Sequence, residues 1–397
     1  MPRILRIVNR FNLGGPTYNA AFLSKYLHGD FQTLLVGGIR EADEDSSEFI
    51  LQNLGQDYLL LPEMRRSLHW QTDHEAYRRI RALIRDFKPD IVHTHASKAG
   101  AIGRSAARSE GVRHIVHTFH GHVFHSYFGK FKTAVFKQIE RRLAAMSTAI
   151  IAISDQQARE IGEIHRICDP GKIRVIPLGF DLDRFSAQKN ERRLCFRQQH
   201  GISDSDFVVG HVGRFAPVKN HSYFVEAFRQ LRDANNTGVT VKAVLVGDGA
   251  LRPETEARFA SLGFSISTPE EPKPEAQIVF TSWIRGVEEV LPAFDTLALS
   301  SWNEGTPVSL VEAQAAGLPV VSTDVGGVRD TLVDGRSGFL CDVSSPGSMA
   351  LRLLSLLGEP ELRTRMGEAA SEYAFSRFHY RRMVAEHEAL YRSFDGN

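Results

Sequence analysis

Two carboxylates, Glu304 and Glu312, have the spacing that most strongly indicates a binding site in this chain. The segment that they enclose, Glu304-Gly-Thr-Pro-Val-Ser-Leu-Val-Glu312, follows a short apolar run that is typical of a buried strand. Thr306 suits an N-cap and Pro307 the first position of a helix, so we expect a helix to begin there. The free amides of its first turn would favour a diphosphate. Glu304 would then lie near a sugar, and Glu312 could accept hydrogen bonds from both hydroxyls of a ribose.

Two cations, Arg214 and Lys219, follow the first apolar run of the second half of the chain, in the segment Gly213-Arg-Phe-Ala-Pro-Val-Lys-Asn220. Gly213 lets a backbone approach a ligand closely, and the two cations can converge on phosphate oxygens. Cleavage of a bond between a sugar and a diphosphate builds negative charge on the leaving group. Cations placed in advance stabilise that charge.

Each of these motifs also has a simpler interpretation. The chain has 47 acidic residues, so the spacing of Glu304 and Glu312 can arise by chance, with both side chains solvated. Arg214 and Lys219 can belong to a solvated basic loop. A third motif, Gly14-Gly15-Pro16 after the first apolar run, lacks the GxGxxG pattern of dinucleotide binding and also fits a plain tight turn. If this glycine pair is a binding site, it would let the backbone of the first domain close over the donor phosphates or the acceptor.

The elements that position these motifs alternate between strand and helix patterns along the whole chain, which predicts an α/β fold of parallel sheets covered by helices. Ser154 and Gln157 form a capping box that predicts a helix over 154–167. We expect a domain over 1–180, a second over 190–377 and a final helix over about 378–397 that packs back on the first. The expected strands are 4–8, 33–36, 90–93, 114–118, 149–153, 173–176, 207–212, 241–246, 277–280, 296–299, 319–322 and 338–341.

Composition excludes several classes of protein. The 397 residues carry 48 basic and 47 acidic side chains, so no overall field favours nucleic acid. The three cysteines are far apart and lack CxxC spacing, which argues against disulfides or a zinc knuckle. The beginning of the chain does not resemble a signal peptide, and no apolar run is long enough to span a bilayer. We therefore expect a cytoplasmic protein.

Taken together, the motifs resemble those of glycosyltransferase family 4, the retaining nucleotide-sugar transferases with the GT-B fold of two Rossmann-like domains facing a cleft. The resemblance runs through nearly the whole chain in family order. It departs at Val328-Arg-Asp330, where many members have Pro-Glu-Leu. The matching segments are Gly14-Gly15, His93-Thr-His95, Thr118-Phe-His-Gly121, Val175-Ile-Pro-Leu-Gly179, Gly213-Arg214 with Lys219-Asn220, Gly247-Asp-Gly249, Glu304 to Glu312, Ala315-Ala-Gly-Leu-Pro319 and Gly326-Gly327.

This resemblance implies a role for each matching residue. Arg214 and Lys219 would bind the diphosphate, Glu304 the donor sugar and Glu312 the ribose, and retention would come from front-side attack, without a carboxylate nucleophile. The residues expected to act in catalysis are His120, Arg214, Lys219 and Glu304. Those expected to bind the donor are Gly14, Gly15, Gly213, Arg214, Lys219, Gly305, Thr306, Pro307, Val308 and Glu312. The candidates on the acceptor side are His95, Lys98 and His120.

The resemblance also implies partners and cofactors. We expect a UDP-sugar as donor substrate, a hexosyl or N-acetylhexosaminyl group as cargo, and a glycan or lipid-linked acceptor, as in surface polysaccharide synthesis. No cofactor or metal is expected. The histidines at 114, 117, 120, 122 and 125 lack accompanying cysteines or carboxylates, and Asp181-Leu-Asp183, a DxD sequence, lies in a connector instead of after a central strand.

Some alternatives remain open at this point. The basic and aromatic region 98–142 includes a helix with Phe131, Val135, Ile139 and Leu143 on one stripe. That stripe can face the core, or the region can contact a membrane surface where lipid-linked acceptors lie. For the activity, a nucleotide-sugar 2-epimerase and a non-catalytic nucleotide-sugar-binding module are the two alternatives to a transferase.

Overall fold

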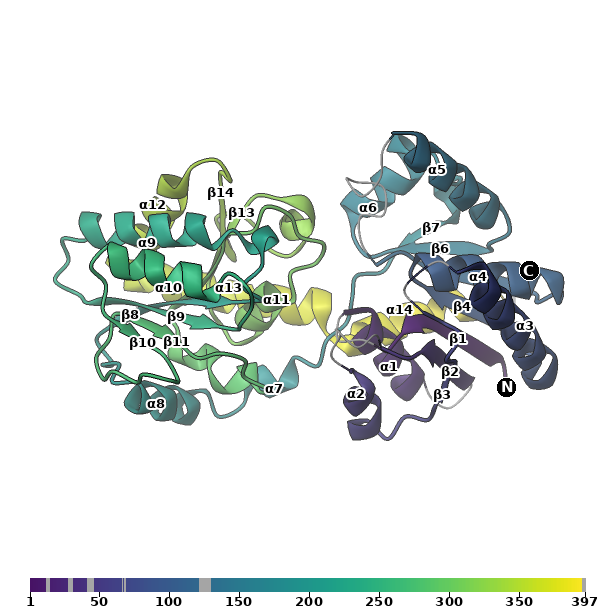
Figure 1. Ribbon diagram of the computed structural model, residues 1–397, viewed down its shortest axis with the longest axis horizontal. Helices are drawn as coiled ribbons and strands as arrows, with labels where there is room; N and C mark the ends of the chain where they lie inside the picture. Colours follow the sequence, from purple (N-terminus) through teal and green to yellow (C-terminus); the bar gives the residue numbers. More distant parts are fainter. Residues whose placement is uncertain are drawn as a thin grey trace. The chain divides into compact units, whose positions relative to one another are not determined.

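The computed structural model describes residues 1–11, 15–27, 31–40, 46–65, 67, 69–120 and 130–394. The chain divides into two compact units (Figure 1). The first unit comprises Met1–Phe180 together with Phe378–Asn397, and the second comprises Asp181–Arg377. The last helix of the chain therefore belongs to the unit that the chain begins.

The first unit is built on a parallel sheet of seven strands in the order β3-β2-β1-β4-β5-β6-β7. Its strands are β1 (Arg3–Arg10), β2 (Gln32–Gly38), β3 (Tyr58–Leu60), β4 (Ile91–His95), β5 (His114–Thr118), β6 (Ala149–Ala152) and β7 (Ile173–Val175). Its helices are α1 (Gly15–Tyr26), α2 (Glu48–Asn53), α3 (Trp70–Phe87), α4 (Ser97–Ser109), α5 (Lys130–Ala145), α6 (Asp155–Arg159), the π-helical turn Glu160–Ile164, the 3-10 turn Pro170–Lys172 and α14 (Tyr380–Arg392).

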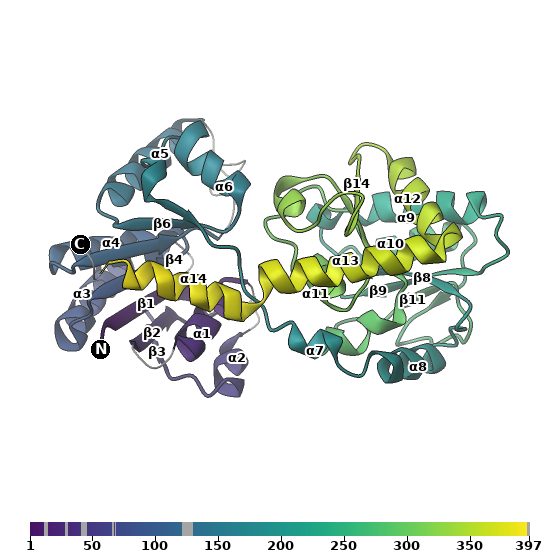
Figure 2. The ribbon, with the colours of Figure 1, turned by 180° about the vertical axis from the view of Figure 1, so that it is seen from behind.

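Helices cover both faces of this sheet. Neighbouring residues of a strand point to opposite faces, so a strand of apolar residues needs cover on each. Ile4 of β1 packs in a cluster with Leu23 of α1 and Met383 of α14. The next residue, Leu5, packs in a different cluster with Ile80 of α3 and Ala99 of α4. Figure 2 shows α14 beside α1 on the first of these faces.

The second unit repeats the architecture, with a parallel sheet in the order β10-β11-β9-β8-β12-β13-β14. Its strands are β8 (Phe207–Val212), β9 (Val241–Val246), β10 (Ile266–Ser267), β11 (Ile278–Phe280), β12 (Thr296–Leu299), β13 (Val320–Thr323) and β14 (Gly338–Cys341). Its helices are α7 (Asp183–Ser186), α8 (Lys189–Gln199), α9 (His221–Ala234), α10 (Arg252–Ser261), α11 (Val308–Ala315), α12 (Pro346–Gly358), α13 (Pro360–Phe378) and the 3-10 turns Pro217–Lys219, Val287–Glu289, Leu291–Ala293 and Gly326–Asp330.

The predicted strands are confirmed, with ends that differ by at most a few residues, and the α/β fold class is confirmed with them. Two edge strands were not predicted: β3, and β10 within the Pro- and Glu-rich segment after Phe264. The Ser154 cap is also confirmed, because the Ser154 hydroxyl accepts a hydrogen bond from the Gln157 amide at 3.1 Å. The helix that it begins is shorter than predicted and passes into the π-helical turn.

Among the described side chains of helix α5, Leu143 is buried but the rest of the stripe that the sequence suggested for the core is not. Val135 and Ile139 are 45% and 44% exposed, whereas Glu140, Leu143 and Ala144 face inward. The Glu140 carboxylate pairs at 2.7 Å with Arg104 of α4, and both side chains are fully buried. Within the described residues, no helix combines the length and the apolar composition needed to cross a bilayer.

Candidate functional site

The predicted motifs of the second unit lie where its strand order reverses, between the neighbouring strands β8 and β12. In doubly wound sheets, the carboxyl ends of the strands at this switch point form the usual ligand crevice. The segment with Lys219 follows β8, and the segment with Glu304 follows β12. Two hydrogen bonds join the segments: the Ser300 hydroxyl donates to the Lys219 carbonyl at 2.9 Å, and the Trp302 amide donates to the Val218 carbonyl at 2.8 Å.

Lys219 and Glu304 are in direct contact at this point. The Lys219 Nζ lies 2.6 Å from Glu304 Oε1, and the two side chains are only 19% and 13% exposed. The Ser301 hydroxyl donates to the same oxygen at 2.6 Å. An ammonium and a carboxylate are thus held together at the rim of the sheet, where the pair can bind polar groups of a ligand.

A glycine pair after β13 supports the Glu304 segment from the other side. The Gly327 amide donates to the Glu304 carbonyl at 2.9 Å. A Cβ at Gly326 would lie 2.1 Å from that carbonyl, and one at Gly327 would lie 1.8 Å from the Gly305 carbonyl. Only glycines permit this approach, so the pair fixes the backbone at Glu304 and Gly305.

Helix α11 begins one residue later than predicted, at Val308. Pro307 is the N-cap in place of Thr306, and its ψ of 102° is extended. Because Pro307 has no amide hydrogen, the first free amides of the helix belong to Val308 and the residue after it.

Glu312 of α11 does not contact Lys219 but lies beside Arg184, at 3.4 Å from the guanidinium. Burial raises the pKa of the Glu312 carboxyl to about 7, against the opposing effect of Arg184. Glu288, which also contacts Arg184 at 3.7 Å, raises this pKa further. Glu312 therefore changes its charge near neutral pH.

Gly213 and Arg214 directly follow β8. The Gly213 amide donates to the Val246 carbonyl at 2.9 Å, and a Cβ on Gly247 would lie 2.1 Å from the Gly213 carbonyl. Close packing of two strand ends thus requires the glycine at 247. The Arg214 side chain is exposed, on the same segment as Lys219.

The residues expected on the acceptor side belong to the first unit. His95 ends β4, and its Nδ1 lies 2.8 Å from the Nε2 of His120. Burial lowers the pKa of His120 to about 3 and the pKa of His95 well below its usual value, so both rings are neutral. The Lys98 ammonium is engaged by Asp73 at 2.5 Å and by the Ser67 carbonyl at 2.6 Å. Gly15 begins α1, and Gly14 lies outside the described residues.

A buried polar network lies beneath His95. His93 Nδ1 contacts the Tyr391 hydroxyl at 2.6 Å and the guanidinium of Arg6 at 2.9 Å. Its Nε2 contacts the Thr118 hydroxyl at 2.8 Å. These contacts tie β1, β4 and β5 to α14. Across the described part of the chain, no three His, Cys, Asp or Glu side chains are grouped to hold a metal ion; His122 and His125 lie outside that part. Metal independence stays a prediction.

Two residues of the site were not predicted, Arg184 and Ser301. Arg184 comes directly after Asp181-Leu-Asp183, whose pattern indicates only a DxD sequence. Its contact with Glu312 spans 128 residues of sequence, so no local pattern indicates it. Ser301 could have been found, because it follows β12 three residues before Glu304, where a hydroxyl can reach the carboxylate.

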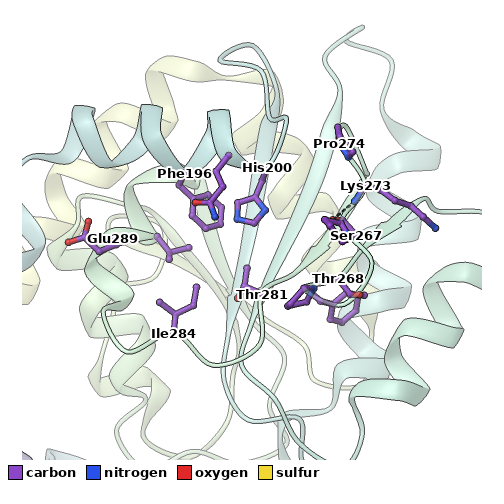
Figure 3. A pocket seen from close by; sticks show the side chains of 14 residues that line it. Phe196, His200, Ser267, Thr268, Lys273, Pro274, Thr281, Ile284 and Glu289 are labelled. Carbon is purple, nitrogen blue, oxygen red and sulfur yellow. Dashed lines mark hydrogen bonds between the residues drawn. The ribbon is translucent and has the colours of Figure 1, made fainter.

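A cavity of about 530 Å³ lies outside these motifs, along the edge of the second sheet (Figure 3). Figure 3 shows Phe196 of α8 and His200, the residue after that helix, with Lys273 and Pro274 to one side and Glu289 to the other. The Lys273 amide donates to the Ser267 hydroxyl at 3.0 Å, which holds the Pro-rich segment against β10. Of the predicted donor-binding residues that the structure describes, none lines this cavity.

Family models match both halves of the chain. The model described as Glycosyltransferase Family 4 matches residues 39–184, and the model described as Glycosyl transferases group 1 matches residues 193–373. Together they cover the motifs described above except Gly14-Gly15, which lies before the first matched range.

Characterised relatives extend this likeness. The chain is 31% identical over 302 residues to the UDP-Gal:alpha-D-GlcNAc-diphosphoundecaprenol alpha-1,3-galactosyltransferase of Escherichia coli, covering 76% of this chain and 75% of the relative. It is 29% identical to the D-inositol 3-phosphate glycosyltransferase of Streptomyces avermitilis, over 72% of this chain and 61% of the relative.

Solved structures show the same fold. A crystal structure of Anabaena Alr3699/HepE in complex with UDP matches with a TM-score of 0.78 and 20% identity, over 98% of this chain and 100% of that chain. The lipopolysaccharide outer core galactosyltransferase WaaB matches with a TM-score of 0.72 and 16% identity, over 98% of this chain and 99% of that chain.

Proposed function

Because the chain belongs to glycosyltransferase family 4 and has the GT-B fold, we propose that it transfers a sugar from a UDP-sugar to a glycan or lipid-linked acceptor, with retention of configuration. The cargo is a hexosyl or N-acetylhexosaminyl group. The name of the Escherichia coli relative, with a UDP-galactose donor and a diphosphoundecaprenol acceptor, supports this substrate class and a role in surface polysaccharide synthesis.

The contact between Lys219 and Glu304 carries this proposal. It holds a cation and a hydrogen-bond acceptor within 2.6 Å of each other at the switch point of the sheet. A nucleotide diphosphate sugar needs this combination, because its phosphates bind cations while its hydroxyls bind carboxylates. Glu312, further along α11, has the right chemistry to accept hydrogen bonds from ribose hydroxyls.

The proposed reaction breaks the bond between the anomeric carbon and the diphosphate oxygen. The acceptor oxygen bonds to the same face of that carbon, and its proton passes to the leaving diphosphate oxygen. Arg214, Lys219 and the first amides of α11 stabilise the charge that builds on the leaving group. Glu304 orients the donor sugar, and neutral His120 donates or accepts a hydrogen bond beside the reacting carbon. No step uses a metal ion.

The acceptor side of the proposal includes a membrane surface. Val135 and Ile139 lie one turn apart on α5, both exposed, and Arg142 is exposed on the same face of the helix. Such a face suits contact with the boundary of an anionic membrane, where lipid-linked acceptors lie. We therefore place the protein in the cytoplasm, peripherally attached to the inner face of the membrane.

Incubation with a panel of labelled nucleotide sugars tests the proposed activity. We expect UDP to be released from one UDP-sugar at a rate that depends on added glycan or lipid-linked acceptor, with label transferred to that acceptor and activity preserved in EDTA. An isomeric nucleotide sugar as product would identify an epimerase. Tight donor binding without any product would identify a binding module.

A further inference from the structure

Another cavity of the second unit, of about 500 Å³, opens beside Lys219, which does not itself line it. It lies at the beginnings of α9 and α10. Its volume falls within the range of about 300–1,000 Å³ that is typical of sites for small molecules. Its lining includes Asn220, His221, Leu251, Glu254, Arg258 and Trp302.

One wall of this cavity is an exposed aromatic ring. The Trp302 side chain is 55% exposed, and its backbone amide is held by the Val218 carbonyl at 2.8 Å. Pro217 and Leu251 add apolar surface to the lining. An indole ring presented in this way offers a flat apolar face to a ligand and regains burial when the ligand covers it.

The inner wall carries polar groups that lack partners. Asn220 and His221 are 7% and 3% exposed. Among the described residues, the Asn220 Nδ2 and both ring nitrogens of His221 have no hydrogen-bond partner. A buried polar atom without a partner costs about 1–3 kcal/mol, so these groups favour a ligand that can bond to them.

The orientation and charge of His221 are fixed by its surroundings. Its ring stacks on Phe215 at 4.2 Å between centroids and 9° between planes. Burial lowers the pKa of His221 to about 4, with a further contribution from Lys219, so the ring is neutral at pH 7. A neutral imidazole offers one donor and one acceptor.

The charges at the mouth of the cavity balance. Glu254 and Arg258 lie one turn apart on the exposed side of α10, and both line the cavity. A site for an anion would present an excess of cations, whereas this one presents donors and acceptors in similar number. That combination, with an aromatic wall, suits an uncharged ligand with several hydroxyls.

We propose that this cavity binds a pyranose unit of a neutral glycan, with the C–H face of the sugar on Trp302 and its hydroxyls bonded to Asn220 and His221. The bound unit is a sugar of the acceptor or product chain beyond the one that reacts. This identification of the ligand rests on the proposed function, because it takes the cavity as a second point of attachment for the acceptor glycan.

Ligand-observed saturation-transfer NMR on the full-length protein tests the inference. The probe is N-acetyllactosamine, a neutral disaccharide, with excess UDP present to occupy the donor site. We expect millimolar binding that weakens roughly tenfold in Trp302→Ala. The matched control is Trp70→Ala, an equally drastic change at a tryptophan of the first unit that is 77% exposed, and it should bind as the parent does.

A second variant guards against an effect of Trp302 on folding. Arg258→Ala changes only an exposed side chain of the cavity mouth, and we expect it to weaken the probe several-fold. Absence of probe binding, equal binding by Trp302→Ala and the parent, or displacement of the probe by inorganic phosphate would each overturn the inference. Because the experiment involves no turnover, probe binding that depends on Trp302 would stand even if the donor panel showed no transfer.

Discussion

The Lys219 ammonium illustrates how one residue is prepared for its chemistry before a substrate arrives. Glu304, at 2.6 Å, fixes its position, so little reorganisation is needed when a diphosphate binds. A cation prepared in this way acts mainly where charge develops during bond cleavage.

Lys219→Ala should therefore lower kcat by about 10²–10³-fold, as the loss of one group that stabilises developing charge does in other enzymes, with a smaller change in KM for the donor. Steady-state kinetics of UDP release measures both constants. Lys273→Ala, at an exposed lysine of the same unit, is the matched control. A raised KM with unchanged kcat would assign Lys219 to ground-state binding alone.

Glu312 should make both donor binding and stability depend on pH. Its pKa is raised from 4.5 to about 7 by burial, so the folded state holds a proton that the unfolded state releases between these values. The free energy of unfolding consequently falls as pH rises from 4.5 to 7 and levels off above. Glu312→Gln should be more stable than the parent by about 1–3 kcal/mol at pH 8.5, measured by urea denaturation, but not at pH 4.5.

The same variant should bind the donor more weakly above pH 7, because the ionised carboxylate is the better acceptor for ribose hydroxyls. In the parent protein, the KM for the donor should rise as pH falls below 7. A donor KM that is equal in the variant and the parent at pH 8.5 would contradict the ribose assignment.

Single residues differ in how far their sequence context predicts them. Lys219 and Glu304 each come after a strand that the sequence predicts. Their proximity therefore follows from the rule that parallel strands place their carboxyl ends at one edge of the sheet. The partner of Glu312 could not be found in this way. Arg184 lies in a short helix before the second sheet begins, and only the folded unit brings it to α11.

At the scale of elements, α4 and α5 are joined by a buried ion pair. Arg104 and Glu140 are fully buried, at 2.7 Å, and Arg104 also donates to the Gly100 carbonyl. Removing one member of such a pair leaves the other charge without compensation in a medium of low dielectric.

Glu140→Ala should consequently lower the free energy of unfolding by about 3–5 kcal/mol. Glu388→Ala, which breaks an exposed pair with Arg392 at 2.8 Å, should cost less than about 0.5 kcal/mol. Urea denaturation followed by circular dichroism compares the two variants. Equal losses would mean that the burial of the Arg104 pair contributes nothing to the packing of α5.

The exposed face of α5 leads to a separate prediction. Val135→Glu combined with Ile139→Glu should leave stability almost unchanged, because both side chains are about half exposed, but should abolish sedimentation with vesicles that contain anionic phosphatidylglycerol. Vesicles of phosphatidylcholine alone are the control for charge. Undiminished sedimentation of the double variant would exclude α5 as the contact.

The sequence predicts long, periodic elements better than short or irregular ones. Strands such as β8 and β9 have six residues each, most of them apolar, and their predicted bounds are the observed ones. The strands β3 and β10 have only three and two residues, too few for a pattern to develop. The beginning of α11 was displaced by one residue because Pro307 can occupy either the N-cap or the first helical position, and only the backbone distinguishes them.

For the molecule as a whole, buried histidines make the first unit sensitive to acid. Among the described residues of this unit, burial lowers the pKa of five rings below the usual 6.5: His93, His95, His117, His120 and His387. In the described second unit, burial lowers the pKa of three: His200, His211 and His221. The unfolded chain binds protons at these positions below pH 6.5 and the folded unit does not, so stability is lost as pH falls below 6.5.

Hydrogen exchange of the full chain should accordingly show the first unit opening before the second as pH falls from 7 to 4.5. His387→Gln removes one titrating ring and should reduce the slope of stability against pH by up to about 1.4 kcal/mol per pH unit. His74→Gln, at an exposed histidine, should leave the slope unchanged. Simultaneous opening of both units would contradict the prediction.

The return of α14 to the first sheet has a consequence for how the protein is made. The ribosome completes residues 1–180 early, but Met383 and Tyr391, which pack in the core of that unit, emerge only after the whole second unit. The second unit, whose chain is continuous, can fold while the first still waits for its closing segment. Until α14 emerges, Phe22 and Leu23 lack the cover that Met383 gives them, so the nascent first unit exposes apolar surface there.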